Sequence, residues 1–306
     1  MAKSVRSAKA KAKQPKAPHV VLPSELEAIA QQVIEAKLPN GLQIRLLPSD
    51  GVPTCSYYTF FKVGARNERP GITGISHLFE HMMFNGARKY GPGQFDRVLE
   101  SNGGTSNAYT SHDVTVYYED FMAEALETVI DLEADRMKSL SVTPQMLESE
   151  RQVVMEERRL RVDNEIGGMM DEELSALLWK AHPYRWPVIG WMKDIERISR
   201  DECLDYFRTY YAPNNATIYV SGDFEPKRVL QLLKKYYGAI KKGPPPPAVV
   251  DAEPEGKGER RAEVRHPAQA PSLMVAWRGP AAQHPDTLTL DVLQYALTVG
   301  QSSRLT

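Results

Sequence analysis

The chain is poor in the features that mark several common protein classes. It has two cysteines in 306 residues, Cys55 and Cys203, too few for a disulfide framework or a cysteine-based zinc site. No apolar run approaches the roughly 20 residues that a membrane-spanning helix needs. Neither sign of charge is in excess, because the formal net charge is −1. We therefore expect a soluble protein with no membrane span and no nucleic-acid partner.

The N-terminal segment lacks both acidic residues and an apolar core. The first acidic residue is Glu25, and residues 1–18 are rich in Lys, Ala and Ser. Without an apolar stretch, this segment does not match a secretory signal. An organellar transit peptide shares some of its composition, but Lys outnumbers Arg, and Pro15 and Pro18 interrupt an amphipathic helix. We expect residues 1–34 to be a basic disordered tail and the protein to be cytoplasmic, with an organellar matrix or the periplasm as the alternative.

Beyond the tail, the composition is that of an ordinary globular domain, and two periodicities alternate along the chain. Alternating apolar residues and turn signals predict strands at 35–48 (two strands around an Asn-Gly turn), 55–63, 103–110, 113–119 and 215–221. Helical spacing of apolar residues predicts helices at 93–101, 121–140, 143–161, 169–181, 199–211 and 225–240. The two kinds of element interleave without strict alternation. This pattern predicts an α+β fold with a mixed sheet packed against helices.

A change in composition divides the chain after this first set of elements. Residues 241–261 contain four consecutive prolines followed by a charged, Gly-containing stretch, which is typical of a linker. Residues 35–240 would then form the main domain. Beyond the linker we expect a strand at 272–278 and a helix at 286–299, an order that repeats the start of the main domain. We interpret residues 262–306 as the incomplete beginning of a second, homologous domain.

The strongest chemical signal is a pair of histidines four residues apart. On a helix His77 and His81 lie roughly 40° apart around the axis, so both rings can reach one metal ion. Glu80 falls about 80° to one side of their bisector, where a general base would stand. Thr73 or Ser76 could supply the helix N-cap. Ordinary surface or core histidines are the alternative, but this ordered triplet of residues favours a zinc site.

A zinc site of this kind needs a third protein ligand, and an acidic helix offers one. Glu150 and Glu157 are two helical turns apart and share a face, whereas Glu156 is turned away by about 100°. If Glu157 reaches the metal, Glu150 can hydrogen-bond a ligand imidazole. The alternative is a solvated helix face on which Glu157 pairs with Arg161.

These residues resemble a known family. His77-Leu-Phe-Glu80-His81, followed 76 residues later by Glu157, resembles the inverzincins, and most closely the M16 family of pitrilysin and mitochondrial-processing-peptidase-like zinc peptidases. Further stretches that match are Gly64–Glu68, Gly86, Gly103–Thr110, His182–Tyr184 and Pro187–Gly190. The resemblance implies a LuxS/MPP-like metallohydrolase domain followed by the start of a second homologous domain.

By that resemblance, His77, His81 and Glu157 are the ligands of one Zn²⁺ per chain. Glu80 is the general base acting on zinc-bound water. Glu150 does not bind the metal and supports a ligand imidazole by a hydrogen bond. Asn107 and Ala108 match the edge strand that pairs with the substrate backbone, which implies a metalloendopeptidase acting on extended or unfolded peptides.

In this family a second domain supplies Arg and Tyr groups to the site, so we expect a homodimer, or a heterodimer with a homologous subunit or second half. Two alternatives to the peptidase remain. One is a non-catalytic or partner-dependent chamber subunit, and the other is a metal-dependent hydrolase of small molecules.

Overall fold

The computed structural model describes residues 24–250 and 252–305. Two compact units divide the chain, and the larger one, Ile29–Ala276, contains every residue that the sequence marks as chemically active. Its strands are β1 (Ile34–Lys37), β2 (Gln43–Pro48), β3 (Thr54–Phe61), β4 (Thr105–Thr110), β5 (Thr115–Met122) and β6 (Ala216–Gly222). Its longer helices are α2 (Ile75–Met82), α3 (Gln94–Ser101), α4 (Leu126–Ser139), α5 (Pro144–Arg158), α6 (Ile166–Leu178), α8 (Arg200–Tyr210) and α9 (Pro226–Tyr237).

Within the described residues the strands form a six-stranded sheet in the order β1-β2-β6-β3-β5-β4. Strands β2 and β6 run parallel, whereas the other neighbours are antiparallel. Strand β4 ends the order, so one of its edges pairs with β5 and the other pairs with no described strand. The prediction of an α+β fold with a mixed sheet is confirmed.

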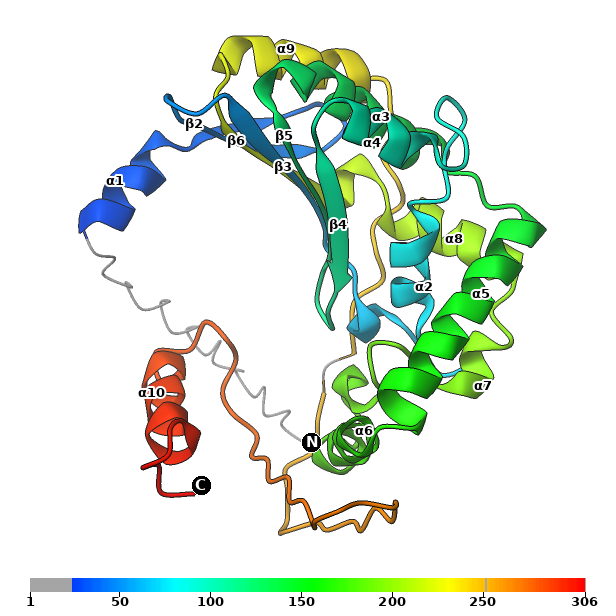
Figure 1. Cartoon of the computed structure of the whole chain (residues 1–306), viewed down its shortest axis with the longest axis vertical. Coiled ribbons are helices and arrows are strands. Elements are labelled where there is room, and N and C mark those ends of the chain that lie inside the picture. The colour runs from blue at the N-terminus through cyan, green and yellow to red at the C-terminus, as the bar shows by residue number, and fades with distance from the viewer. Residues whose placement is uncertain (1–23, 251, 306) are drawn as a thin grey trace, which may run out of the picture. The chain divides into compact units, whose positions relative to one another are not determined.

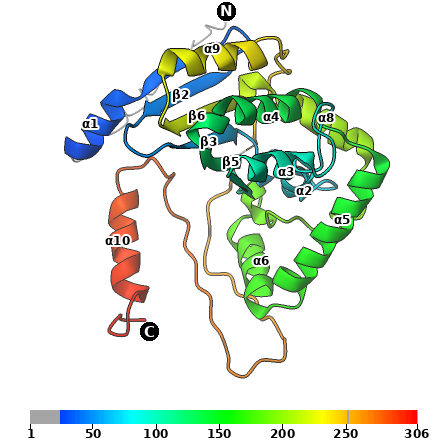
Figure 2. The ribbon, with the colours of Figure 1, turned by 45° about the horizontal axis from the view of Figure 1, so that its top comes forward.

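Helices α4 and α9 cover one face of the sheet (Figures 1 and 2). Strand β3 shows why this face is the core, because its residues alternate between buried and partly exposed. The buried set includes Tyr57 and Phe61, each with no more than 1% of its surface exposed. The Tyr57 hydroxyl lies 2.9 Å from that of Tyr237 in α9, which satisfies two polar groups in an otherwise apolar layer.

A charged cluster lies buried between α4 and the sheet. The Arg136 Nη2 lies 3.0 Å from Glu119 Oε1 and 2.5 Å from Glu133 Oε1. Thr59 donates its hydroxyl proton to the other oxygen of Glu133 at 3.0 Å. The guanidinium also stands over the Tyr117 ring, 4.5 Å from its centre. Burial and, to a lesser extent, the neighbouring Glu133 hold the pKa of Glu119 well above its usual range. The buried cluster therefore disfavours a negative charge on both carboxyl groups at once.

The structure corrects the predicted helix of residues 121–140. Phe121 and Met122 belong to strand β5, and α4 begins only at Leu126. Phe121 is opposite Cys55 in β3 and is 3% exposed, so the alternation of the strand continues through it. An apolar residue at this position suits the end of the strand and the start of the helix equally well, and pairing with β3 decides between them.

Two other expectations also differ from the structure. Residues 272–278 form no strand, and Leu273 and Trp277 are 87% and 78% exposed, because no described strand lies beside them to pair with their backbone. Helix α1 (Ser24–Gln32) occupies part of the predicted tail of residues 1–34. Residues 1–23 lie outside the described residues, so the rest of that prediction is untested.

The smaller unit contains helix α10 (Thr287–Thr298), which confirms the helix expected near residues 286–299. Its side chains are largely exposed, including Leu288 and Tyr295 at 67% and 66%. In the described part of the chain, no helix combines the length and the apolar character needed to cross a bilayer. The division at residue 241 between the main domain and a linker stays a prediction.

The buried charge cluster gives the first prediction. Replacing Arg136 by Met should lower the free energy of unfolding by about 3–5 kcal/mol, because two buried carboxyl groups lose their cation. Urea denaturation of both proteins measures this difference. The matched control is Lys235→Met, which removes an exposed ion pair with Glu127 and should leave the unfolding midpoint nearly unchanged. Equal effects of the two substitutions would contradict the buried role of Arg136.

Candidate metal centre

Helix α2 carries the histidine pair, and its first turn is held by a side chain from outside the helix. The helix starts after Gly74, whose φ of +89° favours glycine. Glu68 accepts hydrogen bonds from the backbone N–H groups of Gly74 at 2.8 Å and Ser76 at 2.9 Å. The predicted N-caps are wrong, because Thr73 donates its hydroxyl to Asp194 and the Ser76 hydroxyl lies 2.6 Å from that of Tyr206.

The structure brings the two imidazoles of α2 and one carboxylate of α5 together. The Glu157 Oε2 atom lies 3.5 Å from His77 Nε2 and 3.4 Å from His81 Nε2. One ligand atom from each of the three residues lies within 4.8 Å of the other two. The other oxygen of Glu157 pairs with Arg161 at 3.0 Å. The two readings of Glu157 are therefore compatible, because one oxygen faces the rings and the other faces the exposed arginine.

The donor set of this cluster fits a divalent ion. Two imidazole nitrogens and one carboxylate oxygen are the ligands that zinc takes in hydrolytic sites. Glu157 Oε2 is buried and has no hydrogen-bond partner among the described residues. Buried acceptors are normally paired, so an orphaned oxygen between two rings is what a metal position leaves when only protein atoms are considered. This observation supports zinc, the metal that the sequence motif suggests.

The two histidines differ in protonation behaviour in the metal-free protein, since burial dominates at His77 and carboxylates dominate at His81. Burial lowers the pKa of His77 to about 4, although Glu157 opposes this effect. Burial would also lower the pKa of His81, but Glu150 and Glu157 together raise it to about 9. His81 Nδ1 lies 3.5 Å from Glu150 Oε2, and this contact lowers the pKa of Glu150. Glu150 thus lies in contact with the His81 ring, and its supporting role stays a prediction.

Glu80 lies on α2 between the histidines, partly buried where the helix packs against β4. Burial raises its pKa above the usual value, while the polar groups of Thr110 and the nearby His81 oppose the shift. A carboxylate with a raised pKa holds a proton more readily, as a general base must after accepting one.

Asn107 and Ala108 lie in the middle of β4, the strand at the open edge of the sheet. Asn107 is opposite Tyr118 of β5, and Ala108 is opposite Tyr117. The strand that packs beside α2 is therefore the one that could accept a further strand.

Comparison with known proteins agrees with this geometry. Residues 46–190 match the family model described as "Insulinase (Peptidase family M16)", and residues 197–306 match "Peptidase M16 inactive domain". The chain belongs to peptidase family M16. This assignment confirms the resemblance drawn from the histidine motif and its distant glutamate.

Among M16 proteins the chain is similar to the zinc protease PqqE of Helicobacter pylori. The two are 35% identical over 274 residues, which cover 88% of this chain and 61% of PqqE. The crystal structure of a protease from Helicobacter pylori matches with a TM-score of 0.81 at 33% identity, covering 89% of this chain and 67% of that one. A probable mitochondrial-processing peptidase subunit beta of Schizosaccharomyces pombe is 26% identical over 262 residues, which cover 84% of this chain and 57% of the relative. The chain thus spans less than two thirds of these curated relatives.

Two features of the M16 site were missed by sequence reasoning. Glu68 ends the Gly64–Glu68 match, but the sequence assigns it no role, because its partners are backbone groups of the next helix. The segment around Pro187–Gly190 also matches, and the structure places Gly190 directly against Thr73. In both cases the only signal in the sequence was a stretch that contains glycine and matches the family. Nothing in either stretch indicates which residues it contacts.

The buried Glu68 predicts a pH-dependent stability. Burial raises its pKa from 4.5 to about 8, so between these values the folded state holds a proton that the unfolded chain releases. The contribution of Glu68 to stability is therefore fully present below pH 4.5 and is lost as the pH rises through 8. Glu68→Gln removes this titration.

Unfolding free energies of the metal-free wild type and Glu68→Gln variant should be compared between pH 5 and 8. The wild type minus variant difference should fall with rising pH, by up to about 1.4 kcal/mol per unit. A difference that stays constant across this range would show that Glu68 does not titrate there.

Proposed function

We propose that this chain is the catalytic part of a zinc-dependent endopeptidase that hydrolyses extended or unfolded peptides. The observation that carries the proposal is the meeting of His77, His81 and Glu157 around one orphaned carboxylate oxygen. Similarity to a zinc protease over most of the chain supports the same conclusion. We propose one zinc ion per chain, held by these three residues.

The residues around the metal position divide the work of peptide hydrolysis. A bound zinc ion would polarise the scissile carbonyl and make a water molecule more acidic. Glu80, next to His81 on α2, accepts the proton of the attacking water and passes it to the leaving amine. Its raised pKa suits both transfers, because the base must bind the proton and then release it. Glu150 holds the ring of His81 from the far side and keeps its Nε2 directed at the metal position.

The substrate would bind by extending the sheet. The free edge of β4 presents backbone N–H and C=O groups next to the helix that carries Glu80. An extended peptide paired with Asn107 and Ala108 would lie beside the metal position and be recognised chiefly through its backbone. This mode favours unfolded segments over particular side chains.

A second function is favoured by one specific observation. Residues 197–306 match a model described as an M16 inactive domain. A partner-dependent subunit of a two-part chamber is therefore the alternative, with a homologous subunit or second half completing the site. Peptide cleavage measured together with solution mass separates a self-sufficient enzyme from a subunit that needs its partner.

Substitution of the proposed base tests the mechanism. Glu80→Gln should keep its zinc but lower the rate of peptide cleavage by at least 10²-fold, because the amide cannot accept the proton. Cleavage of an unstructured peptide and metal content by elemental analysis are measured on the same preparation. If the assay requires a homologous partner, the partner is supplied equally to both proteins. Cleavage at the wild-type rate would refute the role of Glu80.

Substitution of a proposed ligand tests the metal site independently of turnover. His81→Ala should lose zinc after dialysis, because only two of the three proposed protein ligands remain. His284→Ala, a change at an exposed histidine near α10, should retain the wild-type zinc content. Full zinc occupancy in His81→Ala would refute the assignment of this ligand.

A further inference from the structure

Helix α5 carries two arginines, each directly after one of the glutamates that face the histidines. Arg151 follows Glu150 and Arg158 follows Glu157, so the arginines repeat the seven-residue spacing of the glutamates and lie about 100° further around the helix. The two residues are only 9% and 5% exposed. Buried arginines are rare without partners that use their charge and donors. The mechanism proposed above does not use either one.

Both arginines donate to backbone carbonyls of one short segment, residues 190–198. The Arg158 Nη1 atom donates to the carbonyl of Gly190 at 2.6 Å. Arg151 donates through Nη2 to the carbonyl of Ile198 at 2.7 Å, and through Nη1 to that of Ile195. This segment contains the short helix α7 (Met192–Ile195). The side of α5 that lies about 100° from these glutamates is thus tied to this segment at two places, two turns apart.

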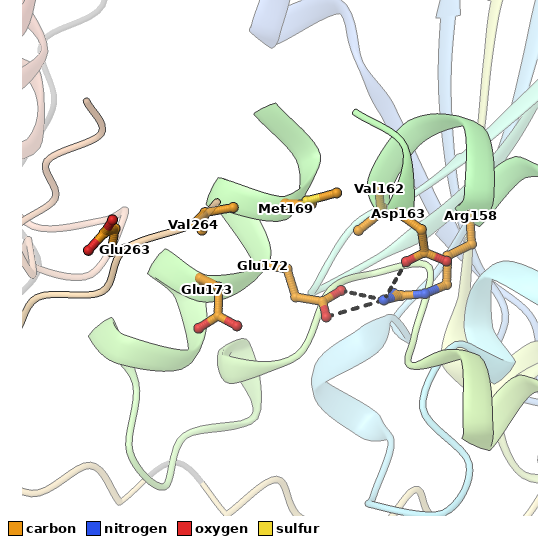
Figure 3. Close-up of a pocket in the computed structure, with 8 residues that line it drawn as sticks. All are labelled: Arg158, Val162, Asp163, Met169, Glu172, Glu173, Glu263 and Val264. Atoms are coloured by element: carbon orange, nitrogen blue, oxygen red, sulfur yellow. Dashed lines mark hydrogen bonds and ion pairs between the residues drawn. The ribbon is translucent and has the colours of Figure 1, made fainter. Parts of the chain in front are cut away.

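Acidic groups hold Arg158 in this orientation. Its Nη2 lies 2.8 Å and 3.2 Å from the two oxygens of Glu172 in α6, and 3.2 Å from Asp163 (Figure 3). The planar guanidinium therefore donates to the carbonyl of Gly190 through Nη1 and contacts two carboxylates through Nη2. A single ammonium group cannot reproduce that fixed fork.

The same segment is in contact with the start of α2. A Cβ atom on Gly190 would lie 2.3 Å from the Thr73 carbonyl oxygen, so the two backbones touch. The Trp191 N–H donates to the Thr73 hydroxyl at 3.0 Å. Asp194 accepts from the backbone N–H groups of Gly71 at 2.9 Å and Thr73 at 3.2 Å. The segment therefore connects the helix that carries Glu157 to the residues that lead into the helix that carries His77.

We propose that Arg151 and Arg158 are positioning residues that fix α5 relative to α2 through segment 190–198. They set the separation between Glu157 and the two imidazoles and touch none of the three. This inference rests on the proposed zinc site. A purely stabilising role would make the protein easier to unfold, but would leave the zinc affinity of the folded protein unchanged. A positioning role changes that affinity.

The test compares neighbouring arginines in the full 306-residue chain. Arg158→Met should weaken zinc binding by about 10–100-fold, as loss of groups that orient metal ligands does. Arg159→Met removes an exposed arginine that pairs with Glu156 and should stay within about twofold of wild type. Zinc dissociation constants are measured by competition with a chelator, well below the unfolding temperature of each protein. Equal affinities of Arg158→Met and Arg159→Met would overturn the inference.

A conservative variant and a spectroscopic probe protect the test against misfolding. Arg158→Lys keeps the charge beside Glu172, so it should fold, and its affinity should fall between wild type and Arg158→Met. Cobalt(II) bound in place of zinc reports ligand geometry through its visible absorption. The cobalt spectra of Arg158→Lys and Arg151→Lys should differ from those of wild type and Arg159→Met. Identical spectra with unchanged affinity would overturn the inference, whereas a wild-type chain that binds no zinc would overturn the proposed function itself.

Discussion

The site depends on the register between two helices that are far apart in the sequence. Helical geometry alone places His77 and His81 one turn apart, so their relation to each other needs no further support. Glu157 comes from a different helix, and its carboxylate must reach both rings to within a few tenths of an ångström. That accuracy comes from packing between α2 and α5, and from the contacts at the outer ends of both helices. A site made by His77 and His81 together with Glu157 therefore requires that α5 keep a fixed position relative to α2.

Buried ionisable side chains lie where this register is set, as they do beneath α4. Glu68 binds the first N–H groups of α2, and Arg151 and Arg158 bind the carbonyls next to α7. Each of them pays a desolvation cost that an apolar residue would avoid. Their partners are backbone groups in loops and helix ends, which would otherwise be buried without hydrogen bonds. Charged side chains with several donors or acceptors can satisfy such groups and also fix their direction.

The sequence predicts well those features that depend on neighbouring residues. Thr143 caps α5 by accepting from the N–H of Met146, and Ser199 forms a capping box with Glu202, both within one helical turn. The alternating strands are correct because one face of the sheet is buried. The cap of α2 could not be predicted in the same way, since Glu68 reaches it across a loop whose path depends on the whole domain. The strand expected at 272–278 is absent because pairing requires a neighbouring strand, which a local pattern does not supply.

The protonation of the site explains how its geometry can exist before a metal arrives. Without an ion, the Glu157 carboxylate faces two imidazole rings and is stabilised by positive charge beside it. The pKa of His81 is about 9, so this ring keeps its proton at neutral pH. Its positive charge stabilises the carboxylates of both Glu150 and Glu157. His77, with a pKa of about 4, stays neutral and ready to act as a donor. A divalent ion bound here would replace one proton in a cluster that is already assembled, so folding would have ordered the ligands before the ion binds.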